Sequence, residues 1–287
     1  MRRESTHRRR LAVQTVHNVV GAMRAIAAGR IQDAQRALEA ARRYHEVVVR
    51  ALSWLLPELS SISSGIQHRP DALLVVTSEQ PLCGSFNPNV IALAERRWNE
   101  LRAEQQKVHL FVVGQRGARQ LRAQGIKPEG AEPAATSLEG LHDLVKRLAQ
   151  LLGRRYASGE MRTLRVIYSR YQSISEQVPT EVQILPPDLA GLASPGPARP
   201  SRFHRYLSPT DLLAGLVDEY AFISLYLIAA ESFASEQASR LVAMNASTRN
   251  TEQMLKGLLD LERRERQVEI TREVLEMIGA RFAGGPS

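Results

Sequence analysis

Residues 6–56 read THRRRLAVQTVHNVVGAMRAIAAGRIQDAQRALEAARRYHEVVVRALSWLL. Apolar side chains recur here every three or four residues, the spacing that lines one face of an α-helix. They are Val13, Val16, Val20, Met23, Ala27, Ala34, Ala37, Ala41, Tyr44, Val48, Ala51 and Leu55, and only Arg30 interrupts them. No proline occurs before Pro57. Such a helix is about 75 Å long. Because this is more than twice the length of an ordinary globular helix, it cannot fold back inside a small domain.

A second long helix is predicted at the other end of the chain. Asp211 to Phe282 contains no proline, and its early part repeats the apolar spacing at Leu213, Leu216, Tyr220, Ile223, Leu227, Ala230, Ala234, Leu241 and Met244. Unbroken, it would reach about 105 Å. Sustained spacing of this kind is typical of a coiled coil, so we expect the two helices to pair. A helical bundle is the alternative, but it needs further amphipathic helices. The pattern weakens after Leu258 at the charged run Glu262–Arg266, where we expect the helix to continue alone or inside a partner.

The middle of the chain alternates between strand and helix patterns. Strands are predicted at 71–78, 107–113, 161–168 and 181–185, and helices at 89–104, from Gly114 through Gln124, and at 138–156. This alternation favours βαβ units with a mostly parallel sheet. The segment from Pro186 to Pro200 is rich in Pro, Gly, Ala and Ser and reads as a linker.

The predicted fold is therefore α/β plus coiled coil, with an antiparallel coiled coil of long N- and C-terminal helices and an inserted α/β domain. The expected divisions are an N-terminal coiled-coil helix at 1–60, the α/β domain at 70–187, a linker at 188–207 and a C-terminal coiled-coil helix at 208–287.

Charge is unevenly distributed along the chain. The formal net charge is +8, and residues 1–50 hold 11 arginines against 4 acidic residues. A basic helix can face nucleic acid, an anionic membrane or an acidic protein. Nucleic-acid modules usually add lysine and aromatic residues, but the chain has four lysines and its first forty residues contain no aromatic residue. A solvated helix face is the simpler interpretation.

Cysteine usage and hydropathy bear on the compartment. Cys83 is the only cysteine, so an intrachain disulfide is excluded and a reducing compartment is the simplest assumption. The arginine-rich start lacks the apolar region of a signal peptide. No window approaches the apolar length of a membrane span, so we expect any membrane association to come through partners.

Motifs for chemistry are sparse. No G-x-x-x-x-G-K-[ST] loop occurs, and the seven histidines are dispersed without metal-ligand spacing. Gly114-Gln-Arg-Gly117 follows a predicted strand and could approach a phosphate, but two glycines at a strand end usually make a turn. Cys83 reads as a structural cysteine in a loop. We expect no catalytic residue, no cofactor and no metal, and an enzyme using the α/β domain is the weakest hypothesis.

Several stretches resemble one family in the same order along the chain. Glu231-Ser-Phe-Ala-Ser-Glu-Gln-Ala-Ser-Arg-Leu-Val-Ala-Met244, continuing to Asn250, is similar to the C-terminal helix of the gamma subunit of F-type ATP synthases. Arg266-Gln-Val-Glu-Ile-Thr-Arg-Glu273 resembles the family's Arg-Gln-x-x-Ile-Thr-x-Glu segment. Arg9 to Tyr44 is similar to the N-terminal helix, and Leu82-Cys-Gly84 with Phe86-Asn87 and Gln177-Val-Pro-Thr180 match two central stretches.

The resemblance implies a function and a set of partners. The gamma subunit is the rotor shaft inside a ring of three alpha and three beta subunits, and with the epsilon subunit it stands on the membrane ring of c subunits. A bacterial member would be peripheral on the cytoplasmic face of the inner membrane and would couple ion flow to ATP synthesis or hydrolysis without catalysing either. The resemblance also nominates Met23, Arg266, Gln267, Thr271 and Glu273 as contacts with beta subunits. A basic coiled-coil scaffold or nucleic-acid-binding protein is the alternative.

The chain departs from the family pattern in one loop. Where the family usually has Asp-Arg-Gly-Leu-Cys-Gly-Gly, this chain has Glu79-Gln-Pro-Leu-Cys-Gly-Ser85. The loop thus lacks an arginine and two glycines, which changes its charge and its backbone freedom. The resemblance is therefore to a divergent bacterial member.

Overall fold

The computed structural model describes residues 2–55, 69–104, 107–188 and 208–283. These residues form two compact units. The first contains the chain up to Ile26 together with the chain from Ala243, and the second runs from Ala27 to Val242. The predicted domain divisions stay a prediction, and apart from Asp188 the expected linker at 188–207 lies outside the described residues.

Two long helices occupy the two ends of the chain, as predicted. Helix α1 spans Arg2–Leu55 and helix α6 spans Pro209–Ala283. They run antiparallel in each unit, because residues early in α1 contact residues late in α6. In the first unit Arg10 Nε donates to Glu262 Oε1 at 3.0 Å. In the second unit Arg42 Nη2 donates to Glu231 Oε1 at 2.8 Å.

The buried positions on α1 repeat every seven residues, with a further set between them. Ala27, Ala34, Ala41, Val48 and Leu55 form the first set, as the sequence predicted. The second set is Ile31, Leu38 and Leu52. Of the other predicted seam residues, Ala37 and Ala51 each precede a buried leucine and are only partly buried, and Val16 and Tyr44 are exposed. The prediction was wrong at these positions because α1 carries apolar side chains on both flanks of its seam.

The inserted segment forms a five-stranded sheet in the order β3-β2-β1-β4-β5. The strands are β1 Asp71–Val76, β2 Val108–Val113, β3 Gly130–Glu132, β4 Thr163–Tyr171 and β5 Gln177–Leu185. All neighbouring strands are parallel except β4 and β5, which pair antiparallel as a hairpin. The mostly parallel sheet was predicted. The short edge strand β3 was missed because three residues carry no periodic signal.

Three further helices connect the strands. They are α2 Phe86–Ala103, α3 Gln115–Ala123 and α4 Leu138–Ala157. Helix α2 begins three residues before the predicted Asn89, so Pro88 lies inside its first turn rather than before it. The first turn of a helix tolerates proline because its N–H groups have no partner within the helix.

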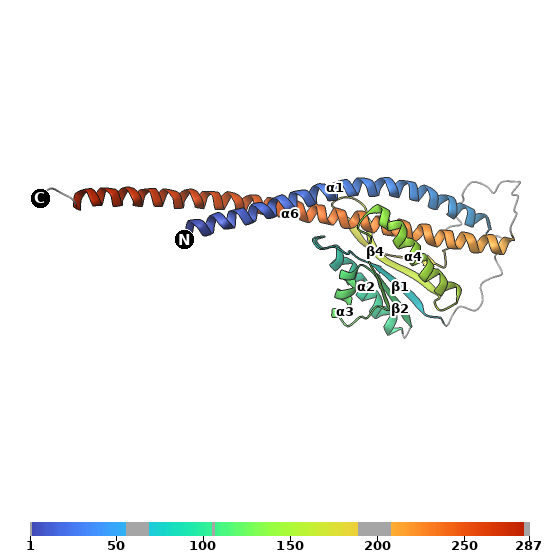
Figure 1. Ribbon diagram of the computed structural model, residues 1–287. Coiled ribbons are helices and arrows are strands. Elements are labelled where there is room, and N and C mark those ends of the chain that lie inside the picture. Colours follow the sequence, from blue (N-terminus) through green and yellow to red (C-terminus); the bar gives the residue numbers. More distant parts are fainter. Residues whose placement is uncertain (1, 56–68, 105–106, 189–207, 284–287) are drawn as a thin grey trace. The chain divides into compact units, whose positions relative to one another are not determined.

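The sheet separates two hydrophobic cores. Figure 1 shows α2 and α3 on the opposite side of the sheet from α4. Because side chains alternate along a strand, Leu73 and Val75 of β1 face α2 and α3. Ala72, Leu74 and Val76 face the larger core. That core also contains α4, the second half of α1 and the first part of α6. The long helices and the sheet of the second unit therefore share one interior.

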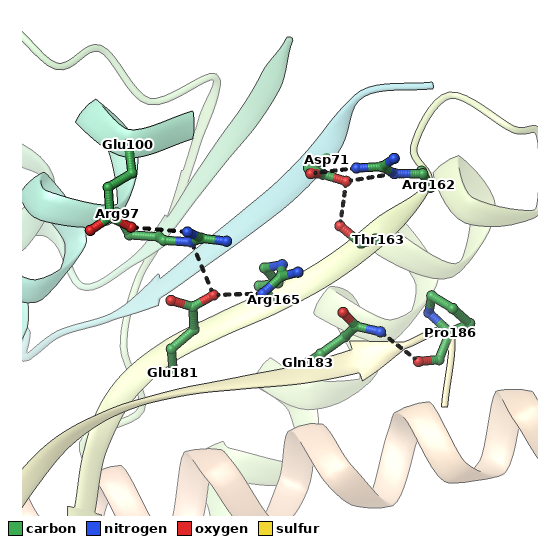
Figure 2. A network of polar contacts seen from close by, with 9 residues as sticks. All are labelled: Asp71, Arg97, Glu100, Arg162, Thr163, Arg165, Glu181, Gln183 and Pro186. Atoms are coloured by element: carbon green, nitrogen blue, oxygen red, sulfur yellow. Dashed lines mark hydrogen bonds and ion pairs between the residues drawn. The ribbon is translucent and has the colours of Figure 1, made fainter. Parts of the chain in front are cut away.

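A network of polar contacts joins β1, β4 and β5 with α2 (Figure 2). Asp71, the buried first residue of β1, accepts hydrogen bonds from Arg162 Nε and Nη2 at 3.1 and 3.0 Å and from Thr163 Oγ1 at 2.6 Å. Nearby, Glu181 of β5 forms ion pairs with Arg97 of α2 and Arg165 of β4. These contacts join strands that lie far apart in the sequence.

We expect Asp71→Asn to destabilise the second unit by about 1–3 kcal/mol, because a charge-assisted pair is lost at a buried position. Burial alone would raise the pKa of Asp71, but Arg162 and Thr163 lower it below its usual value. The carboxylate therefore contributes its stability above about pH 4, and this contribution is lost as the pH falls through the lowered pKa. Urea denaturation of the wild type and of Asp71→Asn measures this. The two free energies of unfolding should differ strongly at pH 7 and less at pH 3, and an equal difference at both pH values would contradict the prediction.

One hydropathy expectation is corrected. Between Thr210 and Ile278, α6 contains an 18-residue window with a mean hydropathy of 1.6, long and apolar enough by composition to cross a membrane. The expectation of no such window was wrong, and 33% of the window is buried inside the structure. Core helices pass the same test, so the window alone is weak support for a membrane span.

Candidate functional site

Four of the five nominated contact residues lie on the last part of α6. Arg266, Gln267, Thr271 and Glu273 are all exposed. Met23 lies on α1 and is half-buried. The hydroxyl of Thr271 donates to the backbone oxygen of Gln267 at 2.8 Å, so the helix itself already satisfies this donor. The amide and guanidinium groups one turn earlier are therefore the more available polar groups.

A groove brings three of these residues together. It has a volume of about 880 Å³ and lies between the start of α1 and the last part of α6. Arg266, Gln267 and Thr271 line it, together with Glu4 and His7 of α1. Met23 and Glu273 are not among its described lining residues. The structure thus brings Arg266, Gln267 and Thr271 together but leaves the other two apart.

The charged run Glu262–Arg266, part of which lines this groove, also contacts α1. Glu262 Oε1 accepts from Arg10 Nε at 3.0 Å and lies 3.3 Å from His7 Nδ1. Glu265 accepts from the hydroxyl of Thr6 at 3.3 Å. Burial alone would raise the pKa of Glu262, but the hydrogen bond and charge of Arg10, with His7 beside them, lower it. The expectation that α6 continues alone or inside a partner from the charged run was wrong at Glu262 and Glu265, because polar pairs with α1 replace the apolar seam there. From Arg266 to Ile278 the helix is exposed.

The last turns of α6 also expose large apolar side chains. They are Val268, Ile270, Val274, Leu275, Met277 and Ile278. Val268 is 68% exposed and Met277 is 65% exposed. A surface that mixes exposed apolar residues with Arg266 and Gln267 is typical of a protein contact. These residues were not among the predicted contacts, although apolar side chains away from the seam are a usable signal.

The middle of α6 lies at the end of the sheet where α/β proteins usually bind ligands. The strand order reverses between β1 and β4, and ligands commonly lie outside the carboxyl ends of such strands. Here Ser235 Oγ of α6 donates to Ser169 O of β4 at 2.8 Å. Tyr168 OH donates to Glu231 Oε2 at 2.9 Å. Residues 232–240 of α6 are all buried, so the helix fills this position.

The suggested phosphate site at Gly114-Gln-Arg-Gly117 is filled from within the chain. The backbone N–H of Gln115, at the start of α3, donates to Glu79 Oε2 at 3.0 Å. The same oxygen accepts from Ala134 N at 3.1 Å. A carboxylate thus lies where a helix N-terminus would bind an anion. These glycines serve close packing instead, because a Cβ on Gly117 would lie 2.2 Å from Thr77 Oγ1.

Replacing Gly117 should therefore be costly. We expect Gly117→Ala to lower the free energy of unfolding by about 1–3 kcal/mol, since the methyl group overpacks against buried Thr77. Gly153→Ala in α4 is the matched control, because no atom lies within 4 Å of its added Cβ. It should stabilise the helix by about 0.5–1 kcal/mol. Chemical denaturation of both variants measures the difference, and shifts of the same sign would contradict the prediction.

Cys83 is buried and its sulfur lies 3.4 Å from Ser78 Oγ, as a structural cysteine would. Within the described ranges, no group of three or more His, Cys, Asp or Glu side chains is placed to hold a metal ion.

Known proteins match this chain over almost its whole length. The family model described as ATP synthase matches residues 3–283. The ATP synthase gamma chain of Methylobacterium sp. is 32% identical, with 94% of this chain and 96% of that protein covered. The gamma chain of Granulibacter bethesdensis is 31% identical, with 93% and 94% covered.

A solved structure has the same fold. A chain from the central stalk and c-ring of the Tetrahymena thermophila mitochondrial ATP synthase aligns with a TM-score of 0.60 and 19% identity, covering 79% of this chain and 98% of that chain. At this identity the likeness supports the fold alone. The full-length sequence matches decide the family: the chain belongs to the ATP synthase gamma-chain family.

Proposed function

We propose that this chain is the central rotor shaft of a bacterial F-type ATP synthase. It turns inside a ring of three alpha and three beta subunits and couples ion flow through the membrane sector to ATP synthesis or hydrolysis. The observation that carries this proposal is the match to gamma chains from residue 3 to residue 283, in a chain with two antiparallel terminal helices. The basic-scaffold alternative does not account for that match.

The shaft works through unequal contacts. A rotor transfers energy only if its orientations favour different conformations of the surrounding subunits, since a contact equal in all states shifts no equilibrium. We propose that Arg266, Gln267 and Thr271 make such contacts with beta subunits, with Met23 and Glu273 at separate points. Support comes from the exposure of the four polar residues and from the groove that three of them line.

The chain itself makes and breaks no bond in this proposal. The last residues of β4, near where an α/β enzyme would hold a substrate, contact α6, and the loop after β1 contacts Arg240 of α6. Catalysis belongs to the nucleotide sites of the surrounding ring. The epsilon subunit and the c-ring are the further partners. The chain is peripheral on the cytoplasmic face of the bacterial inner membrane and is held there through these partners.

Copurification from the native host tests the proposal. A tagged chain is recovered after gentle solubilisation of the membranes, and the accompanying proteins are identified. We expect alpha, beta and epsilon subunits, the c-ring and ATPase activity. Recovery of nucleic acid, or of the tagged chain alone, would overturn the proposal.

A further inference from the structure

A buried charged pair lies in the middle of α6. Arg240 Nη2 donates to Glu236 Oε1 at 2.6 Å, one helical turn away. Arg240 is 3% exposed and Glu236 is 7% exposed. Among the described residues, Nε and Nη1 of Arg240 have no hydrogen-bond partner. Buried charges with incomplete partners are costly, so a role beyond filling space is expected for this pair.

Arg240 also contacts the loop that follows β1, residues 77–85. Its Nη2 atom lies 3.5 Å from the backbone oxygen of Pro81, to which it donates. Two further charged groups act on Glu236. Burial raises the pKa of Glu236, Arg240 and Arg30 of α1 lower it, and Glu79 of the loop raises it. The pair therefore lies where α1, α6 and the loop meet within the second unit.

The loop is anchored at its ends. At its start, Ser78 N donates to Asn87 Oδ1 at 2.9 Å and Asn87 Nδ2 donates to Ser78 Oγ at 2.8 Å. The carboxylate of Glu79 binds the backbone N–H groups of Gln115 and Ala134. These contacts fix the residues on either side of the tip.

The tip of the loop holds an unfavourable conformation. Leu82 has a backbone φ of 65°, which residues other than glycine rarely adopt. Its side chain is 54% exposed. Such a conformation persists only where the surroundings determine it. The carbonyl that Arg240 contacts belongs to Pro81, the residue immediately before Leu82. Arg240 of α6 thus donates to the carbonyl oxygen of the peptide bond that leads into Leu82.

We propose that Arg240, balanced by Glu236, is a positioning residue that latches the 77–85 loop to α6 and holds Leu82 in its exposed left-handed conformation. The latch joins the loop to a helix that already shares a core with the sheet. Its consequence in the complex rests on the proposed rotor function, because slippage between loop and helix would waste torque. The latch itself does not depend on that function.

Three variants of the full-length chain test the latch. Arg240→Met removes the donors and leaves Glu236 unbalanced. The double variant Glu236→Met with Arg240→Met restores charge balance but not the contact with Pro81. Arg43→Met is the control, because Arg43 forms an exposed ion pair with Glu39 at the same one-turn spacing. Hydrogen exchange is followed at the amides of residues 79–85 and at those of α4.

We expect the loop amides to exchange at least about tenfold faster in both Arg240 variants. In the double variant the α4 amides should exchange as in the wild type, which separates positioning from a general loss of stability. Arg43→Met should change neither region. Wild-type exchange in the loop of the double variant, or equally faster exchange in the loop and α4, would overturn the latch.

The same variants are then assembled with the partner subunits. The number of ions pumped per ATP hydrolysed should fall in the double variant and stay unchanged in Arg43→Met. Faster amide exchange in the loop with an unchanged number of ions pumped per ATP would overturn the role of the latch in coupling. It would leave the latch itself supported. Failure of the wild-type chain to join alpha and beta subunits would instead overturn the proposed function.

Discussion

Arg266→Ala should slow both ATP synthesis and ATP hydrolysis by about tenfold or more, without preventing assembly of the complex. The side chain is exposed on α6, so its loss leaves the cores of the chain intact. If Arg266 contacts a beta subunit, the variant loses a charge-assisted hydrogen bond of about 1.5–3 kcal/mol. A loss of that size in the rate-limiting conformation corresponds to roughly 10–100-fold in rate.

The matched control is Arg272→Ala. Arg272 is exposed on the same helix, and its Nε atom already donates to Glu276 Oε1 at 2.9 Å. It also occupies a variable position of the Arg-Gln-x-x-Ile-Thr-x-Glu pattern. We therefore expect the turnover of the complex with Arg272→Ala to stay close to that of the wild type. Turnover is measured on purified complexes with equal subunit content, and an unchanged rate for the Arg266 variant would contradict the assignment.

The two long helices were predictable because their signal is repeated many times. Each apolar turn adds support, and the absence of proline fixes their extent to within a few residues. The choice between neighbouring seam positions was less determined. Ala37 and Leu38 are both apolar, and only the position of the partner helix decides that Leu38 is buried. A single sequence does not contain that information.

The polar contacts were less predictable because they join residues far apart in the chain. Glu262 belongs to a charged run that reads as a solvated surface, yet it pairs with Arg10. Ser235 and Arg240 look like the polar face of a helix, but both are buried against the sheet and its loop. Local composition predicts exposure for such residues, and only the folded arrangement supplies their partners.

The nominated contact residues came from a resemblance and not from the physics of an isolated helix. Nothing in the spacing of Arg266, Gln267 and Thr271 distinguishes them from an ordinary solvated face. Helical geometry does place residues one turn apart on the same side, and this accounts for Gln267 and Thr271 sharing a groove. Their roles stay predictions that the Arg266 experiment addresses.

Phe233→Ala should give the largest loss of stability among the variants considered, about 3–5 kcal/mol. Phe233 is 4% exposed and lies in the core that joins α1, α4, α6 and the sheet. Removing its ring leaves a cavity that neighbouring elements cannot fill without moving apart. Most domains are stable by only about 5–15 kcal/mol, so the second unit would be close to unfolding at physiological temperature.

Val242→Ala is the control for this variant. Val242 lies on the same helix and is 47% exposed, so its truncation should change stability by no more than about 0.5 kcal/mol. Urea denaturation of the full-length chains should shift the midpoint strongly for Phe233→Ala and little for Val242→Ala. Similar midpoints would show that α6 is not held by this core. Because α6 is one continuous helix, loss of its packing in the second unit should also lower the yield of assembled complex, whereas Arg266→Ala should leave that yield unchanged.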